Sequence, residues 1–206
     1  MRSANARLPA WLKWVYLGYV VMLVPAYWIQ YGPSNFLWFS NVALLLGLVG
    51  TWTQSRLLLS TQVASVSLLE LAWLFGFVIG LLSGGHSPFG LTDYMFDQTL
   101  PLWLRGLSLY HLVLPWLLLW MVWRLGYDRR AWPVWTLAGW GVLLLAYLTP
   151  DDRNVNFVYG YGADAEQLLP PLAWLALVMA VAAVAWALTH WVVLSVWRKF
   201  DWPIVP

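Results

Sequence analysis

Residues 103–120, WLRGLSLYHLVLPWLLLW, are almost entirely apolar, yet they include an arginine, a serine and a histidine. Arg105, Ser108 and His111 follow one another at intervals of three residues, and residues three or four apart lie on one side of an α-helix. They form a polar stripe that ends before Pro115. Ionisable side chains are costly to bury among apolar ones, so by default they face a protein-lined interior. The segment therefore predicts a membrane helix with one polar face.

The composition excludes a soluble domain. Of the 206 residues, 62% are hydrophobic and 10% are charged, whereas soluble domains carry about 25% charged residues. The 18 tryptophans and 10 tyrosines fit a membrane protein, because amphipathic rings favour the headgroup layer. The net charge of +2 does not indicate a nucleic-acid partner, and without cysteine there is no disulfide or thiolate chemistry.

Six segments approach the roughly 20 apolar residues that a spanning helix needs. They are residues 11–30, 36–53, 57–82, 102–124, 131–149 and 168–197. The first run is too long for a signal-peptide core, so we expect it to be retained as a helix. The predicted fold is all-α: a polytopic membrane protein with six transmembrane helices that form a single domain over residues 1–206.

Basic residues predict the orientation. If the six segments alternate, only Arg105 and Arg153 of the 11 basic residues fall on the outer side. The other nine are Arg2, Arg7, Lys13, Arg56, Arg124, Arg129, Arg130, Arg198 and Lys199. The outer side instead carries Asp93, Asp97, Asp151, Asp152, Asp164 and Glu166. Loops of this length follow the positive-inside rule, which predicts that both termini are cytoplasmic.

Glu70 is the only acidic residue inside an apolar segment. A carboxylate in that position must be protonated, paired or hydrated. One interpretation is a proton relay or general base. The other is a structural carboxyl group that pairs with Arg105 or hydrogen-bonds a neighbouring helix.

His111 lies roughly 13 Å from the outer end of its helix, at 1.5 Å per residue. Ser40, Asn41 and Glu70 lie at compatible depths on the second and third segments, so one pocket open to the outer side can contain them all. The outer loops are rich in aromatic residues, and we expect them to fold back onto this mouth. Asn154 and Asn156 would belong to its lid. A neutral histidine can act as a general base, and an interhelical hydrogen bond is the alternative role for His111.

The remaining histidines predict no shared site with His111. His190 lies in the cytoplasmic half of the last segment, at the wrong depth to share a haem with His111. His86, with Asp93 and Asp97, is a weak pattern for a metal site, and a solvated loop is the simpler interpretation. We therefore predict no metal and no cofactor. Phosphate-loop, HExxH and GxSxG motifs are absent from the sequence.

Residues 31–41 (YGPSNFLWFSN), residues 100–105 continuing through 110–115, and Asn156–Tyr159 resemble elements of the androgen-induced and androgen-dependent six-helix membrane hydrolases and their bacterial relatives. The resemblance implies hydrolysis of fatty-acid esters of hydroxy fatty acids, with a helix-two threonine as nucleophile and a helix-four histidine as base. His111 matches the histidine. Trp38 stands in place of the threonine, and Ser40 is turned roughly 200° from it around a helix.

The leading hypothesis is a lipid or fatty-acyl ester hydrolase or transferase with an outward-facing polar pocket. His111 would be the base and Ser40 the candidate nucleophile, or else His111 and Glu70 would activate water. Asn41, Glu70 and Arg105 would orient or stabilise charge. The alternative is a non-catalytic subunit of a larger membrane complex that contacts a pigment, haem, quinone or lipid. Membrane lipids are the expected partners, and the bacterial inner membrane is the expected location.

Overall fold

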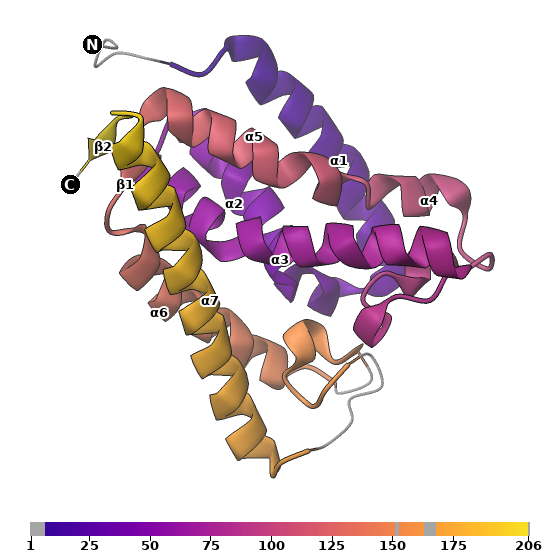
Figure 1. Ribbon diagram of the computed structural model, residues 1–206. Helices are drawn as coiled ribbons and strands as arrows, with labels where there is room; N and C mark the ends of the chain where they lie inside the picture. The colour runs from indigo at the N-terminus through magenta and orange to yellow at the C-terminus, as the bar shows by residue number, and fades with distance from the viewer. Residues whose placement is uncertain (1–6, 151–152, 163–167, 206) are drawn as a thin grey trace.

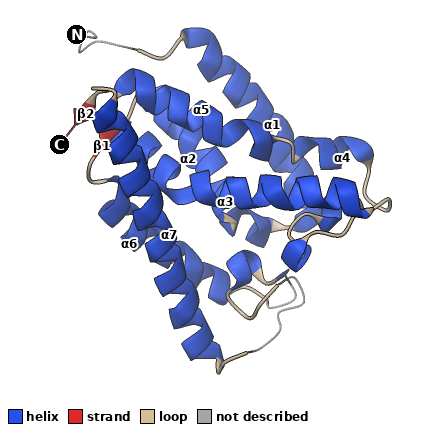
Figure 2. Ribbon diagram, viewed as in Figure 1, coloured by secondary structure: helices blue, strands red, loops and turns tan. Residues whose placement is uncertain are grey.

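Helices make up most of the computed structural model, which describes residues 7–150, 153–162 and 168–205 (Figures 1 and 2). The helices are α1 (Ala10–Tyr31), α2 (Phe39–Thr53), α3 (Arg56–Ser83), α4 (Leu102–Leu107), α5 (Tyr110–Leu125), α6 (Ala131–Tyr147) and α7 (Pro171–Lys199). Short 3₁₀ helices are η1 (Pro33–Leu37), η2 (Pro88–Gly90), η3 (Asp93–Met95) and η5 (Val155–Phe157). The predicted helical class is confirmed, apart from two-residue strands β1 (Tyr127–Asp128) and β2 (Ile204–Val205), which pair in parallel.

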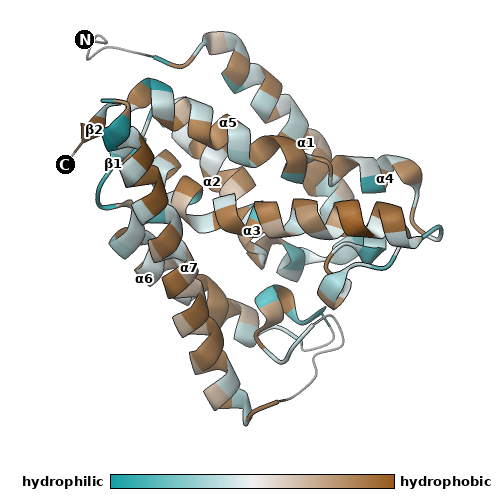
Figure 3. Cartoon of the chain, viewed as in Figure 1, coloured by the Kyte–Doolittle hydropathy of each residue, from teal (hydrophilic) through white to brown (hydrophobic). Residues whose placement is uncertain are grey.

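Four helical stretches are long and apolar enough to cross a membrane: Ala10–Tyr31, Arg56–Ser83, Leu102–Leu125 and Pro171–Lys199. The predicted segments 36–53 and 131–149 form the shorter helices α2 and α6, of 15 and 17 residues. Helix α2 begins only at Phe39 because the preceding residues are wound into η1. The brown surfaces of α1, α3 and α7 in Figure 3 show that these helices carry much of the apolar sequence.

The predicted continuous helix over residues 102–124 is interrupted at Ser108 and Leu109. The amide of His111 bonds the Ser108 carbonyl at 3.1 Å, which is the tighter 3₁₀ pattern. The carbonyl of Leu107 accepts instead from the Tyr19 hydroxyl of α1. The interruption therefore depends on a neighbouring helix, and His111 lies in the first turn of a new helix, α5.

Helix α3 lies at the centre and contacts α2, α5, α6 and α7 (Figure 1). Residues 59–67 are buried without interruption. Beyond them only one stripe of α3 remains buried, formed by Glu70, Trp73, Gly76 and Gly80 at helical spacing. This stripe faces α5 and the loop that follows α3.

The 84–97 loop folds back onto α3. A Cβ atom at Gly80 would lie 2.4 Å from the Phe96 ring, and one at Gly76 would lie 3.5 Å from Thr92. Residues without side chains thus allow the loop to approach the helix closely. This contact places η3 over the buried stripe of α3.

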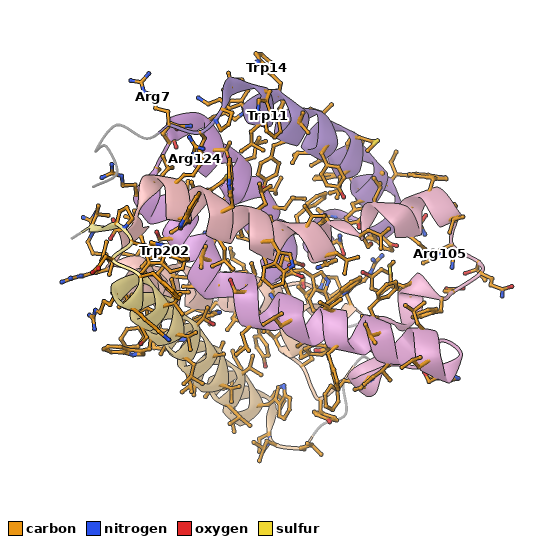
Figure 4. All side chains as sticks on the ribbon, turned by 45° about the horizontal axis from the view of Figure 1, so that its top comes forward. Arg7, Trp11, Trp14, Arg105, Arg124 and Trp202 are labelled. Atoms are coloured by element: carbon orange, nitrogen blue, oxygen red, sulfur yellow. The ribbon has the colours of Figure 1, made fainter. Side chains whose placement is uncertain are left out.

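Most of the described basic residues gather at one end of the bundle, which we call the basic end. There the Arg124 guanidinium binds the Arg7 carbonyl at 3.4 Å, and β2 joins the chain end to the loop after α5. The opposite end, which we call the loop end, carries the 84–101 and 153–162 loops and Arg105 (Figure 4). Five charged residues used in the orientation argument lie outside the described residues: Arg2, Asp151, Asp152, Asp164 and Glu166.

Gly139 and Gly141 of α6 provide a matched test of the packing. A Cβ at Gly139 would lie 2.4 Å from the Trp186 ring, whereas one at Gly141 would meet nothing within 4 Å. We expect Gly139→Ala to destabilise the protein by about 1–3 kcal/mol because the ring must shift. Gly141→Ala should be neutral or stabilising by up to about 1 kcal/mol, from helix propensity. Unfolding in detergent measures both variants, and equal effects would contradict this packing.

Candidate active site

The side chains of Glu70 of α3 and His111 of α5 form a buried hydrogen-bonded pair. The Glu70 Oε2 atom lies 2.7 Å from His111 Nδ1, and the two side chains are 2% and 11% exposed. The structure therefore brings together the two residues that the sequence placed at compatible depths. A pairing of Glu70 with Arg105, the alternative weighed from the sequence, does not occur: the Arg105 guanidinium donates to the Met95 carbonyl at 2.9 Å.

Two aromatic rings stack on the His111 imidazole. Trp73 of α3 lies 4.5 Å away with an interplanar angle of 15°, and Tyr110 lies 4.2 Å away at 25°. Two rings of this size cannot share one face of an imidazole, so they cover its two faces. Phe77 and Phe96 extend the row beyond Trp73, with successive centroids 5.2 and 5.7 Å apart. The imidazole is thus fixed in orientation, and its cationic form has a π face on each side.

The two nitrogens of His111 differ in their surroundings. Nδ1 contacts the carboxylate, whereas Nε2 takes part in none of the hydrogen bonds of the residues that the structure describes. A carboxylate on Nδ1 favours the tautomer with its proton there, which leaves the lone pair on Nε2. This arrangement of carboxylate and histidine is the one used by general bases in hydrolases.

The expected hydroxyl nucleophile is not next to the imidazole. Ser40, in the first turn of α2, lies beside the Tyr110 hydroxyl. No hydrogen bond joins it to His111 among the described contacts. Asn41 accepts from the Tyr110 hydroxyl at 2.8 Å and donates to the Asn35 carbonyl at 2.8 Å. Among the described contacts, Ser40 and Asn41 touch the Tyr110 hydroxyl and not the Glu70–His111 pair. They therefore act on the pair by positioning Tyr110.

Asn154 and Asn156 serve the backbone of the loop end. The Asn156 side chain accepts from the Phe39 amide at 3.1 Å and donates to the Leu37 carbonyl at 2.8 Å, so it holds the start of α2. Asn154 accepts from the Tyr159 amide and donates to the carbonyls of Gly160 and Gly162. Both side chains are buried, and neither makes a described contact with Glu70 or His111. Instead, the 84–97 loop provides the cover, through Tyr94.

A cluster of hydroxyl groups extends from the pair toward the loop end. Tyr94 accepts a hydrogen bond from Trp73 Nε1 at 3.3 Å and lies beside Ser108. The Ser108 and Tyr27 hydroxyls are 2.6 Å apart. The second oxygen of Glu70, Oε1, is buried and has no hydrogen-bond partner among the described residues. A free acceptor therefore lies close to this cluster.

The other histidines do not join this site. His190 Nδ1 contacts the Tyr127 hydroxyl at 2.8 Å near the basic end. In the loop of His86, the Asp93 carboxylate accepts from the amide and the hydroxyl of Ser87, each at 2.6 Å. Within the described residues, no group of three or more His, Cys, Asp or Glu side chains could hold a metal ion.

The sequence did not indicate the roles of Trp73, Tyr94, Tyr110 and Tyr27. Two of these residues could have been identified from their sequence positions. Trp73 follows Glu70 by three residues, and Tyr110 adjoins His111. Tyr94 and Tyr27 approach only through tertiary packing. Comparison of the chain with family models, with curated proteins and with solved structures found no match. The functional argument therefore depends on this geometry.

A double-mutant cycle tests the Glu70–His111 pair. Glu70→Ala and His111→Ala are each expected to cost about 1–3 kcal/mol of stability, because each leaves a buried partner unsatisfied. The double variant should cost less than the sum, with a coupling energy of about 0.5–3 kcal/mol. Glu70→Gln keeps an oxygen acceptor and should cost less than Glu70→Ala. Unfolding in detergent measures all four proteins, and additive losses would contradict the pairing.

Proposed function

We propose that this protein is a membrane-embedded hydrolase or acyltransferase that acts on lipid-borne acyl esters. The observation that carries the proposal is the 2.7 Å contact between Glu70 and His111 Nδ1, which leaves Nε2 outside every hydrogen bond of the described residues. Glu70 lies 14 residues from the start of α3, or roughly 20 Å along the helix axis. A substrate that partitions into the membrane has access to that depth.

The proposed chemistry uses His111 as proton acceptor and then as donor. Nε2 removes a proton from water, or from an acceptor alcohol, as its oxygen attacks the ester carbonyl carbon. Glu70 stabilises the resulting imidazolium and holds its orientation. When the ester C–O bond breaks, the imidazolium returns the proton to the departing alkoxide. The products are an alcohol and either a carboxylic acid or a new ester.

Water or an acceptor alcohol is favoured over Ser40 as the attacking group, because Ser40 lies beside the Tyr110 hydroxyl and none of the described hydrogen bonds joins it to His111. The androgen-induced and androgen-dependent hydrolases use a threonine in helix two, and Trp38 stands at that place. Trp38 packs edge-on against Phe157, with centroids 5.6 Å apart. We propose that this protein is related to that family. In this proposal His111 serves as the family's histidine does, whereas the attacking group differs from the family's threonine.

The topology in the proposal has six crossings, one domain and cytoplasmic termini, in a bacterial inner membrane. The gathering of Arg7, Arg124 and most of the other described basic residues at one end supports this orientation. Helices α2 and α6 are shorter than the hydrocarbon core, and local thinning of the bilayer accommodates such helices at modest cost. Exposed Trp103 and Trp116 provide surface for lipid. Trp11 and Trp14, labelled in Figure 4, are exposed as well.

Single cysteines test the topology, because the sequence contains none. Gln98→Cys lies at the loop end and Arg129→Cys at the basic end, and both positions are exposed. In intact cells, a membrane-impermeant maleimide should label Gln98→Cys only, while permeabilised cells should label both. Labelling of Arg129→Cys in intact cells would contradict cytoplasmic termini.

Purified protein in detergent, supplied with acyl esters of long-chain alcohols, tests the activity. We expect hydrolysis that falls about 10²–10⁴-fold in His111→Gln, since a general base contributes that much. Glu70→Gln should retain partial activity, and Gly141→Ala should retain all of it. A fluorophosphonate probe should not label the protein. Labelling that Ser40→Ala abolishes would instead restore Ser40 as nucleophile.

The same purified protein distinguishes a second candidate. An open Nε2 opposite a carboxylate on Nδ1 is also the arrangement of a metal-ligating histidine with its outer partner. It would suit a non-catalytic subunit in which His111 ligates a haem or chlorin. Absence of hydrolysis together with a visible absorption band lost in His111→Gln would contradict the hydrolase and favour this candidate.

A further inference from the structure

We propose that a pocket at the basic end binds the phosphate group of an anionic phospholipid. The pocket has a volume of about 540 Å³ and is open to the surface. It is lined by residues 54–57 at the turn between α2 and α3, by Asp128 of β1, by Arg130 and by Val205 of β2. The candidate active site is elsewhere in the bundle, so this inference does not depend on ester chemistry.

Hydrogen bonds within the protein fix the walls of this pocket. The Asp128 amide donates to the Ser60 hydroxyl of α3 at 3.0 Å, and Asp128 pairs with Val205 between β1 and β2. The Gln54 side chain accepts from the Leu8 amide at 2.8 Å. Segments that are far apart in the sequence are therefore held around one space. A pocket that is already ordered binds a ligand with little further loss of conformational entropy.

Arg130 presents a fixed guanidinium group at the pocket. Its Nε and Nη2 atoms donate to Asp128 Oδ1 and Oδ2 at 3.1 and 2.8 Å. The Asp128 side chain is 3% exposed, whereas the Arg130 side chain is 61% exposed. The carboxylate is thus covered and neutralised, while Nη1 lies outside the hydrogen bonds of the described residues. Guanidinium donors held in one orientation match the oxygens of a phosphate group.

The charge of the pocket favours a lipid phosphate. Two arginines, Arg56 and Arg130, and one aspartate, Asp128, line it, so its formal charge is +1. A phosphodiester carries a single negative charge, which matches this value better than a divalent phosphate does. The basic residues around the pocket repel the ammonium group of a zwitterionic headgroup and attract anionic lipids. The pocket is therefore suited to an anionic phospholipid.

The pocket lies at the depth of the lipid headgroups. Helix α3 has 28 residues and begins at Arg56, so it extends roughly 42 Å at 1.5 Å per residue. This length exceeds the hydrocarbon core of a bilayer, which is about 30 Å thick. The first residues of α3 therefore reach the headgroup layer. A lipid can place its phosphate in the pocket while its acyl chains remain in the membrane.

Native mass spectrometry of the full chain in detergent tests this site, with phosphatidylglycerol as the probe. Arg56→Gln and Arg130→Gln each remove one charge from the pocket, whereas Arg129→Gln removes the same charge from an exposed neighbour that does not line it. Loss of a hydrogen bond to a charged group should weaken binding at least about tenfold in the first two variants. Arg129→Gln should bind as wild type does. Phosphatidylcholine should bind the wild type at least about tenfold more weakly than phosphatidylglycerol.

Each result bears on the inference. Equal losses in all three variants would overturn it, because a diffuse basic surface would then explain the binding. Wild-type affinity in both Arg56→Gln and Arg130→Gln would also overturn it. If Arg130→Gln fails to fold because Asp128 loses its partner, the comparison of Arg56→Gln with Arg129→Gln decides alone. Inorganic phosphate or glycerol phosphate that displaces the lipid at equal concentration would support phosphate recognition and overturn the lipid as its source.

Discussion

A carboxyl group in the middle of an apolar bundle must be neutralised or hydrogen-bonded, since an isolated buried charge is prohibitively costly. Glu70 meets this constraint through His111 on the facing helix. The neighbouring structure follows from that pairing. The two helices must pack closely, and the flanking side chains must be aromatic or hydroxyl-bearing, so that the polar atoms have partners while water and lipid are kept away.

Small residues make this enclosure possible. Gly76 and Gly80 lie on the same stripe of α3 as Glu70, and the loop that carries Tyr94 and Phe96 rests on them. The loop thereby covers the pair without adding a further helix. Asn156 has a comparable role at the start of α2, where its side chain replaces the hydrogen bonds that a regular helix would make one turn earlier. Polar loop residues thus set the positions of helix ends.

The helices could be predicted because long apolar runs and their limits are local properties of the sequence. The convergence of Glu70 and His111 followed from their depths along neighbouring helices. The interruption at Ser108 could not be predicted, because it requires the Tyr19 hydroxyl from another helix to take over a backbone carbonyl. Asn154 and Asn156 were expected to belong to a lid over the pocket, and a sequence does not show that their side-chain amides hydrogen-bond backbone groups. The stacked row of aromatic rings could not be distinguished in the sequence, because many other aromatic residues occur along the chain.

The stacking of His111 between Trp73 and Tyr110 restricts more than its position. An imidazole enclosed on both faces cannot turn over without opening the row of rings. Its two nitrogens therefore cannot exchange places during a reaction cycle. A proton taken up at Nε2 cannot be carried to the Glu70 side by ring rotation, so the two sides of the ring remain chemically separate. In the proposed reaction, such a histidine acts as a fixed barrier as well as a base, and each of its nitrogens contacts only one side of the site.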